Sequence, residues 1–355
     1  MLTATLLSLA QAATVTEIPP FLRGDIEIAY AYDRLAGGLD EHGDPGADYV
    51  PVGTRRIEAH QLRYGAAFGA APGLAVFVSV PHDAWTGVSY DSWSKMVYDP
   101  TTGSGTYVGS NAQEARLAVQ GSGVEGAWIG LRGTPFSEAF KTRDNRATML
   151  LEGAVRTPNP SNQYAIVTPN SSGAPGERGA GPGGVGLRLR TAFSTTFRKS
   201  QPYVSFAFTD EEPSTITIAD DEGHVLNKKA DIDPGDNIRS VAGVEFVASE
   251  NSANGSRFGI DLHVAFDYTS AGVVPTGEYL PGVLVPDAGA VQTAEVLEAG
   301  GGLALNWRPF QYMQLNLHGD VAGHLPQRIE NAYSVYTGAD TIHVVSGLDL
   351  VIRVR

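Results

Sequence analysis

The segment LRYGAAFGAAPGLAVFVSVPH, residues 62–82, contains two alternating runs joined by the small-residue turn Ala70-Ala71-Pro72-Gly73. Every second residue is apolar or small in both runs: Leu62, Tyr64, Ala66 and Phe68 in the first, and Leu74, Val76, Val78 and Val80 in the second. Because successive side chains of a β-strand point to opposite faces, each run has one face without charge. The segment therefore predicts a β-hairpin with one apolar face.

Similar alternating runs recur along the chain, and the connections between them are alternately long and short. The expected strands are 23–32, the two strands of 62–82, 123–133, 147–157, 185–193, 202–209, 238–249, 258–268, one ending at Trp307, 313–320 and 342–352. The long connections are polar, and the expected ones include 33–52, 83–122, 158–184, 210–237 and 322–340. About twelve strands with this alternation are typical of bacterial outer-membrane barrels, whose short turns are periplasmic and whose long loops are extracellular. We predict an all-β, antiparallel, up-and-down transmembrane barrel in the bacterial outer membrane, in contact with the lipid bilayer.

The face that meets lipid follows from the cost of burying charge. In the run 185–193, Arg188 and Arg190 alternate with Leu187 and Leu189. An arginine on the lipid face at the bilayer midplane costs about 2–4 kcal/mol. The polar faces are therefore expected to point inward and the apolar faces outward. Aromatic residues near strand ends, such as Tyr203 and Trp307, are interpreted as parts of interfacial girdles.

Composition excludes several other classes of protein. The chain has 355 residues and no cysteine, which rules out a disulfide scaffold and a cysteine-based metal site. Its net charge of −14 argues against nucleic acid as a partner, because nucleic-acid-binding proteins need a basic face. After the N-terminus there is no apolar run of about 18 residues, the length that a transmembrane helix needs.

The start of the chain, MLTATLLSLAQAA, has an apolar run followed by the small-x-small site Ala10-Gln11-Ala12. This pattern is typical of the second half of a secretory signal peptide, although no basic residues precede it. We interpret 1–12 as a partial signal peptide, 13–22 as a short periplasmic segment and 23–355 as one barrel domain. So short a segment before the first strand disfavours a sizeable N-terminal plug.

Residues 62–82 resemble a hairpin of outer-membrane proteins of the meta-pathway of phenol degradation type, with Tyr64-Gly65, Leu74, Val78 and Pro81 carrying the match. Segments 121–133, 150–160 and 179–194 are similar to further strands of that family. Two features depart from its pattern: Val124-Glu125 stands where the family has Gly-Asp, and the last residue is Arg355 rather than an aromatic residue. The resemblance implies a barrel that admits small hydrophobic or aromatic compounds, and it implies no catalytic residues.

The sequence thus predicts a channel or transporter for small solutes whose lumen is lined by polar residues. The expected lumen-lining residues are Glu27, Arg63, Glu152, Arg156, Arg188, Arg190, Glu245, Asp261, His263, Asp267, Arg308, His318 and Asp320. The alternative is a barrel that these residues fill by charge pairing, with a structural or surface-interaction role and no transport, because side chains can occlude an interior of this size.

A barrel hydrolase is the less favoured alternative, and we predict no enzyme activity. His263 with Asp261 or Asp267, and His318 with Asp320, are same-face pairs. The nearest same-face residues are expected to lie about 7 Å apart, beyond direct hydrogen bonding for short side chains without a cross-strand partner. Acidic residues in 40–48 and 231–236 could hold calcium, but solvated acidic loops are the simpler interpretation. We therefore predict no cofactor and no metal ligand, and the sequence does not determine the oligomeric state.

Overall fold

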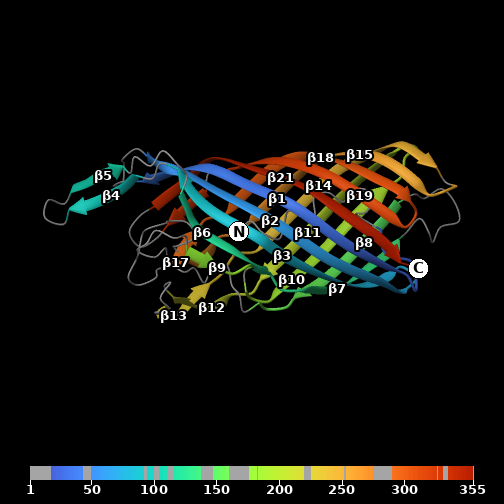
Figure 1. Ribbon diagram of the computed structural model, residues 1–355, viewed down its shortest axis with the longest axis horizontal. Helices are drawn as coiled ribbons and strands as arrows, with labels where there is room; N and C mark the ends of the chain where they lie inside the picture. Colours follow the sequence, from blue (N-terminus) through green and yellow to red (C-terminus); the bar gives the residue numbers. More distant parts are fainter. Residues whose placement is uncertain are drawn as a thin grey trace.

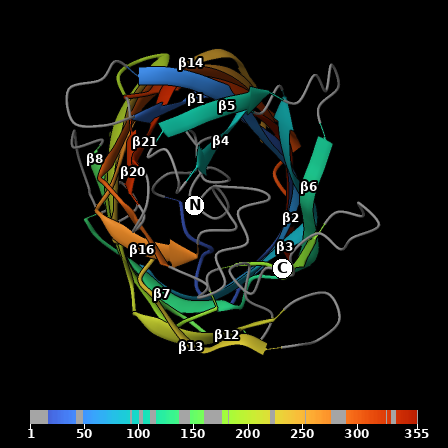
Figure 2. The same cartoon turned by 90° about the vertical axis from the view of Figure 1, so that its left-hand side faces the viewer.

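The computed structural model describes residues 17–42, 49–91, 94–99, 104–109, 116–136, 147–159, 176–181, 183–219, 225–251, 253–275, 290–325, 327–330 and 335–354. In this part of the chain an antiparallel sheet closes on itself as a barrel (Figures 1 and 2). The barrel closes where β1 (Gly24–His42) pairs with β21 (Val335–Val354), from Gly24 opposite Val354 to His42 opposite Val335. Among these residues no helix is long and apolar enough to cross a membrane.

Each wall strand pairs with the next one along the chain. Between β1 and β21 the wall consists of β2 (Tyr49–Ala71), β3 (Leu74–Asp91), β6 (Arg116–Val124) continued by β7 (Trp128–Phe136), β8 (Ala147–Arg156), β10 (Gly186–Thr195), β11 (Ser200–Glu211), β14 (Asn237–Asn251), β15 (Ser256–Thr269), β18 (Val296–Phe310) and β19 (Met313–His324). With β6 and β7 counted as one, the wall has twelve strands, and the predicted fold is confirmed.

The predicted hairpin at 62–82 is formed by β2 and β3. Ala71 stands opposite Leu74 across the turn, where Gly73 has a φ of 75°. This left-handed backbone conformation is accessible to glycine at little cost, which explains the glycine at the tip of a tight turn. The apolar face of the hairpin points outward: Tyr64, Phe68 and Val76 are exposed, whereas Ala75 and Phe77 are buried.

The strands extend further than the apolar pattern predicts on the side of the long connections. Residues 33–42 belong to β1 and 49–61 to β2, with Asp33 opposite Ala59, so the expected loop 33–52 is wrong for most of its length. Likewise β3 continues to Asp91 inside the expected loop 83–122. The ladder is made by backbone groups, so pairing continues where the side chains no longer alternate between apolar and polar.

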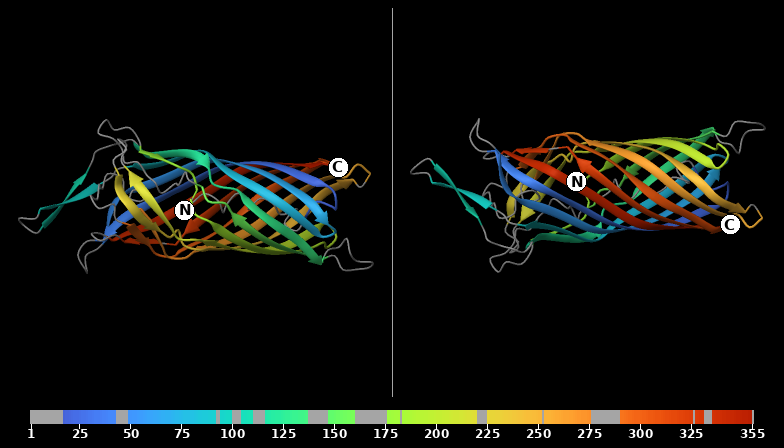
Figure 3. Two further views of the ribbon diagram at one scale, coloured as in Figure 1. Left: turned by 90° about the horizontal axis from the view of Figure 1, so that it is seen from below. Right: turned by 90° about the horizontal axis from the view of Figure 1, so that it is seen from above.

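The long connections gather at one end of the barrel and contain further strands (Figure 3). These are the hairpin of β4 (Ser94–Asp99) and β5 (Ser104–Gly109), the hairpin of β12 (Ser214–Ala219) and β13 (Val225–Ile232), and the short strands β9 (Gly176–Arg178), β16 (Gly272–Pro275), β17 (Ala290–Thr293) and β20 (Gln327–Glu330). At the other end lie the short connections 72–73, 196–199, 252–255 and 311–312. Gly24 and Val354 also lie there, so the first and last wall strands begin and end at the short-turn end.

One wall strand is interrupted. The single strand expected at 123–133 is instead two strands, β6 and β7, separated by Glu125, Gly126 and Ala127. β3 pairs with β6 through 82–90 and with β7 through 74–79, and the Glu125 amide donates to the carbonyl of Pro81. Gly126 has a φ of 104°, and a Cβ there would lie 2.4 Å from the carbonyl oxygen of Thr157. The break therefore requires glycine.

Candidate functional site

The two faces of the barrel wall differ sharply in chemistry. On β10, Leu187 and Leu189 are 40% and 53% exposed, while Arg188 between them points to the other side and pairs with Glu152 of β8. The same division holds on β21, where Ile342, Leu348 and Ile352 are exposed and His343 and Asp349 are buried. The residues expected to face inward all lie on the side opposite the exposed apolar residues, where they form ion pairs and hydrogen bonds with other interior side chains.

The first interior group, the arginine cluster, comprises Arg132, Glu152, Arg188 and Arg190. Glu152 accepts hydrogen bonds from the Nε of Arg132 at 2.7 Å and of Arg188 at 3.1 Å. Arg190 donates from Nε to the Ser205 hydroxyl at 3.1 Å. Glu152 is only 5% exposed, so one buried carboxylate neutralises part of a group of permanently charged guanidinium groups.

Aromatic rings and further ion pairs border the arginine cluster. Arg132 lies 4.1 Å over the ring of Phe77, and Arg188 lies 4.6 Å over that of Trp128. Such cation–π contacts gain strength when they are removed from water. Nearby, Arg156 pairs with Glu211 of β11 through both guanidinium NH₂ groups and also donates to the carbonyl of Gly184. Arg63 pairs with Glu27 across β2 and β1.

The second interior group, the histidine network, comprises Tyr203, Asp261, His263, His318 and Asp320. His263 lies with Nδ1 2.8 Å from Asp261 and with Nε2 2.6 Å from Asp320. The Tyr203 hydroxyl donates to Asp261 at 3.1 Å, and Nδ1 of His318 lies 3.4 Å from Asp320. These residues come from β11, β15 and β19, so the network extends along the inner wall over the intervening strands β14 and β18.

Two sequence-based interpretations are wrong here. His263 and Asp261 do bond directly although they are two residues apart, because both side chains lean along the strand and close the gap expected from their Cα atoms. Tyr203 is not part of an interfacial girdle, since it is 6% exposed and bonds inside the barrel. The His263 side chain has no solvent-exposed surface, so this pair does not present a base to a substrate.

The remaining predicted residues have separate partners. Glu245 is fully buried and pairs with Arg257 at 3.0 Å. Asp267 lies 3.9 Å from Arg239 and accepts a hydrogen bond from the Asn237 amide. Arg308 donates to Gln314 at 3.0 Å and to Glu17 at 3.2 Å. The predicted lumen-lining residues thus belong to several separate groups of ion pairs and hydrogen bonds.

The segment just before β1 lies inside the short-turn end of the barrel. Glu17 bonds to Arg308 of β18 and to Arg353 of β21, while Ile18 packs against Leu150 and Tyr203. Burial raises the pKa of the Glu17 carboxyl, but the charges and hydrogen bonds of the two arginines outweigh this effect and hold it below its ordinary value. The domain boundaries at 12 and 22 stay predictions, since residues 1–16 lie outside the described part of the chain.

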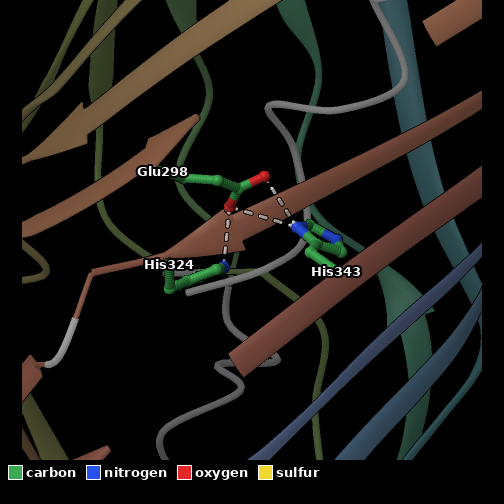
Figure 4. A group of neighbouring side chains, drawn as sticks. All are labelled: Glu298, His324 and His343. Atoms are coloured by element: carbon green, nitrogen blue, oxygen red, sulfur yellow. Dashed lines mark hydrogen bonds and ion pairs between the residues drawn. The ribbon is translucent and has the colours of Figure 1, made fainter. Parts of the chain in front are cut away.

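A third interior group was missed by the sequence analysis. This group, the histidine–glutamate cluster, comprises Glu298, His324 and His343 together with Asp33 (Figure 4). His324 and Asp33 were assigned to loops, and Glu298 lies before the predicted part of its strand. His343 was visible on the polar face of the last strand, but nothing in the sequence indicated its partners. Asp349 and Asn316, both with no exposed surface, were missed in the same way.

Beside this third group lies a small cavity with room for about one water molecule. Its lining combines small side chains, such as Ala265 and Gly301, with the charged residues Arg239, Asp267 and Glu298. The small residues leave room that longer side chains would fill. The interior therefore contains both tightly paired charges and a small cavity between side chains.

The acidic segments considered for calcium are only partly described. Residues 43–48 lie outside the described part of the chain. Asp233 accepts a hydrogen bond from the amide of Gly235, and Asp236 accepts one from that of Glu211. Asp233 thus stabilises a local turn, and Asp236 joins two segments that are 25 positions apart in the chain.

No family model matches this sequence, and no curated protein matches it. The solved structures that it is similar to include an outer membrane channel from Pseudomonas putida F1, with 9% identity, 96% of this chain and 98% of that chain covered and a TM-score of 0.47. A Pseudomonas aeruginosa FadL homologue has 10% identity, with 99% and 96% covered and a TM-score of 0.44. The outer membrane protease OmpT from Escherichia coli has 8% identity, with 96% and 99% covered and a TM-score of 0.36.

Proposed function

We propose that this chain is an outer-membrane β-barrel channel for small solutes, with apolar and aromatic compounds as the favoured class. The observation that carries the membrane assignment is the set of large apolar side chains exposed on the outside of a closed barrel. Ile129, Leu262 and Leu317 are each at least 50% exposed, and similar residues occur on every wall strand. A soluble protein rarely exposes so extensive an apolar surface, whereas a transmembrane barrel needs one.

The interior supports the channel assignment. We infer that the predicted inward-facing residues line the lumen and that solutes pass between them. The small cavity beside Glu298 shows that side chains do not fill the interior completely. The resemblance of residues 62–82 to barrels of the meta-pathway of phenol degradation type supports aromatic compounds as solutes. Charged groups packed in the interior narrow the lumen, so we expect slow passage and small ionic conductance.

An occluded barrel with a structural role is the second candidate. The observation in its favour is that Glu245, Asp261 and Asp349 have no exposed surface, which means that side chains close around them. In such a barrel the ion pairs would only hold the wall together. The two candidates differ in whether solutes cross.

The membrane assignment is tested by placing charge on the outer face. Leu189→Arg, near the middle of β10, is expected to destabilise the barrel in lipid vesicles by about 2–4 kcal/mol. The matched control Thr195→Arg, at the end of the same strand, should change the free energy of unfolding by about 0–1 kcal/mol. Equal effects of the two substitutions would contradict a lipid-facing outer surface.

The channel assignment is tested by uptake into Gram-negative cells, whose outer membrane excludes apolar dyes. Cells that express the chain should take up N-phenyl-1-naphthylamine faster than cells that express an unrelated closed barrel of similar size. The uptake of a polar cephalosporin should increase little. Equal uptake of the dye in both strains would support the occluded barrel, and equal acceleration of dye and cephalosporin would indicate an unselective pore.

A further inference from the structure

Three potential metal ligands meet on the inner face of the wall. Glu298 of β18 stands directly opposite His324 of β19, and His343 of β21 stands opposite Ala322, two residues from His324. Nε2 of His324 lies 2.7 Å from Glu298, and Nδ1 of His343 lies 3.0 and 3.1 Å from the two oxygens of the same carboxylate (Figure 4). One ligand atom from each of the three residues lies within 4.8 Å of the others.

The other ring nitrogen of His343 contacts a second carboxylate. Its Nε2 lies 2.7 Å from Oδ1 of Asp33, on the neighbouring strand β1, and both side chains are about 3% exposed or less. A carboxylate that accepts the proton of one imidazole nitrogen turns the lone pair of the other nitrogen toward a metal, and such carboxylate–histidine–metal triads are common. Asp33 therefore fixes the ring in the orientation that a ligand requires.

We propose that Glu298, His324 and His343 bind one divalent transition-metal ion, with Zn²⁺ as the best fit. Two imidazole nitrogens and one carboxylate oxygen form a donor set that zinc accepts, with a further position left for water. Bonds of about 2.0–2.2 Å in tetrahedral geometry would separate the donor atoms by about 3.3 Å. The observed carboxylate–imidazole distances of 2.7 to 3.1 Å need to open by only a few tenths of an ångström.

Two further observations favour a cation at this position. Nε2 of His324 is buried, and among the described residues its one polar contact is the Glu298 carboxylate at 2.7 Å. The adjoining cavity is lined by Glu298 and His343 and also by the carboxylates of Asp267 and Asp320, and Arg239 is the one arginine or lysine among its described lining residues. The cavity provides space for metal-bound water, and the carboxylates make the site attractive to a positive ion.

A metal here would join three strands near the long-loop end. β18, β19 and β21 each contribute one ligand, and Asp33 adds β1. The ion would thus tie together the strands on one side of the seam at which the barrel closes. The site does not depend on transport, so it can be tested whether or not solutes cross.

The experiment is a titration of untagged, detergent-solubilised protein with ZnCl₂ by calorimetry, with CoCl₂ as a spectroscopic probe of coordination. Wild-type protein is expected to bind one Zn²⁺ per chain, and bound Co²⁺ should show the intense visible absorption of a tetrahedral site. His343→Ala and His324→Ala should abolish both signals. Asp33→Asn should keep the ligands and weaken zinc binding by about 10–100-fold.

His82→Ala is the matched control, because His82 lies on β3 outside the cluster, and it should bind zinc as the wild type does. A heat-dependent gel shift checks that each variant is a folded barrel, and His324→Gln replaces His324→Ala if the latter does not fold. The proposal is overturned if folded wild-type protein binds no zinc, or if the histidine variants bind it with unchanged affinity and stoichiometry.

Discussion

The arginine cluster and the histidine network occupy different parts of the same interior and neutralise their buried charges in different ways. Around Glu152 on β8, guanidinium groups outnumber the carboxylate that neutralises them. His263 on β15 lies instead between two carboxylates, those of Asp261 and Asp320. Arginine keeps its charge at every physiological pH, whereas histidine can lose its proton between about pH 5 and 8.

This difference determines how each group responds when one of its partner residues is removed. If a partner is removed from the arginine cluster, the remaining charge stays and must be solvated inside the barrel. If a partner is removed from the histidine network, an imidazole can become neutral and avoid most of that penalty. We therefore expect the removal of a partner residue to destabilise the barrel more in the arginine cluster than in the histidine network. The following predictions test this contrast.

The largest effect is expected for Glu152→Ala. This substitution removes the carboxylate that Arg132 and Arg188 share and leaves two partly buried guanidinium groups without it. Breaking a buried ion pair in this way destabilises a protein by about 3–5 kcal/mol. Denaturant unfolding in lipid vesicles, followed by tryptophan fluorescence, measures the loss. Glu250→Ala, at an exposed end of β14, is the control and should have little effect. A loss below about 1 kcal/mol for Glu152→Ala would contradict the contrast.

An intermediate effect is expected for Asp320→Asn, which removes a carboxylate from His263 and His318. We expect a loss of about 1–3 kcal/mol near neutral pH. Unfolding of both variants in the same lipid vesicles at one pH measures the difference, and a loss from Asp320→Asn as large as that from Glu152→Ala would contradict the contrast.

The smallest effect is expected for Tyr203→Phe. It removes the hydroxyl that donates to Asp261 while it keeps the ring that packs against Leu150 and Ala192. The loss should be about 0.5–1.5 kcal/mol, the net value of a typical hydrogen bond. Tyr312→Phe, which changes an exposed ring in the turn after β18, serves as the control in the same unfolding assay. If Tyr203→Phe equals Asp320→Asn in effect, the hydroxyl contributes more to the network than one hydrogen bond does.

Much of the barrel was predictable because strand alternation is a local signal. The hairpin at 62–82, the inward direction of Arg188 and the outward direction of Leu189 all follow from the period of two together with the cost of charge in hydrocarbon. Strand ends were predicted less well. Beyond the lipid-facing belt the side chains on both faces can be polar, so the pattern vanishes at Asp33 while the backbone ladder continues to His42.

The interior groups were predictable as a set but not as pairs. Arg156 was expected inside, yet its partner Glu211 is 55 positions away and lay in a predicted loop. The histidine–glutamate cluster was missed altogether, since two of its residues lie where alternation gives no information. For such residues only spatial proximity indicates a role.

The amino-acid sequence by itself determined that the chain forms alternating strands, which side of each strand carries charge, and that the charged sides must share an enclosed space. These three facts depend on neighbours along the chain and on the cost of desolvating charge, which sequence reveals. The tertiary structure alone decided which charges meet. His343 finds Asp33, 310 positions earlier, only because the first and last strands pair with one particular register when the sheet closes.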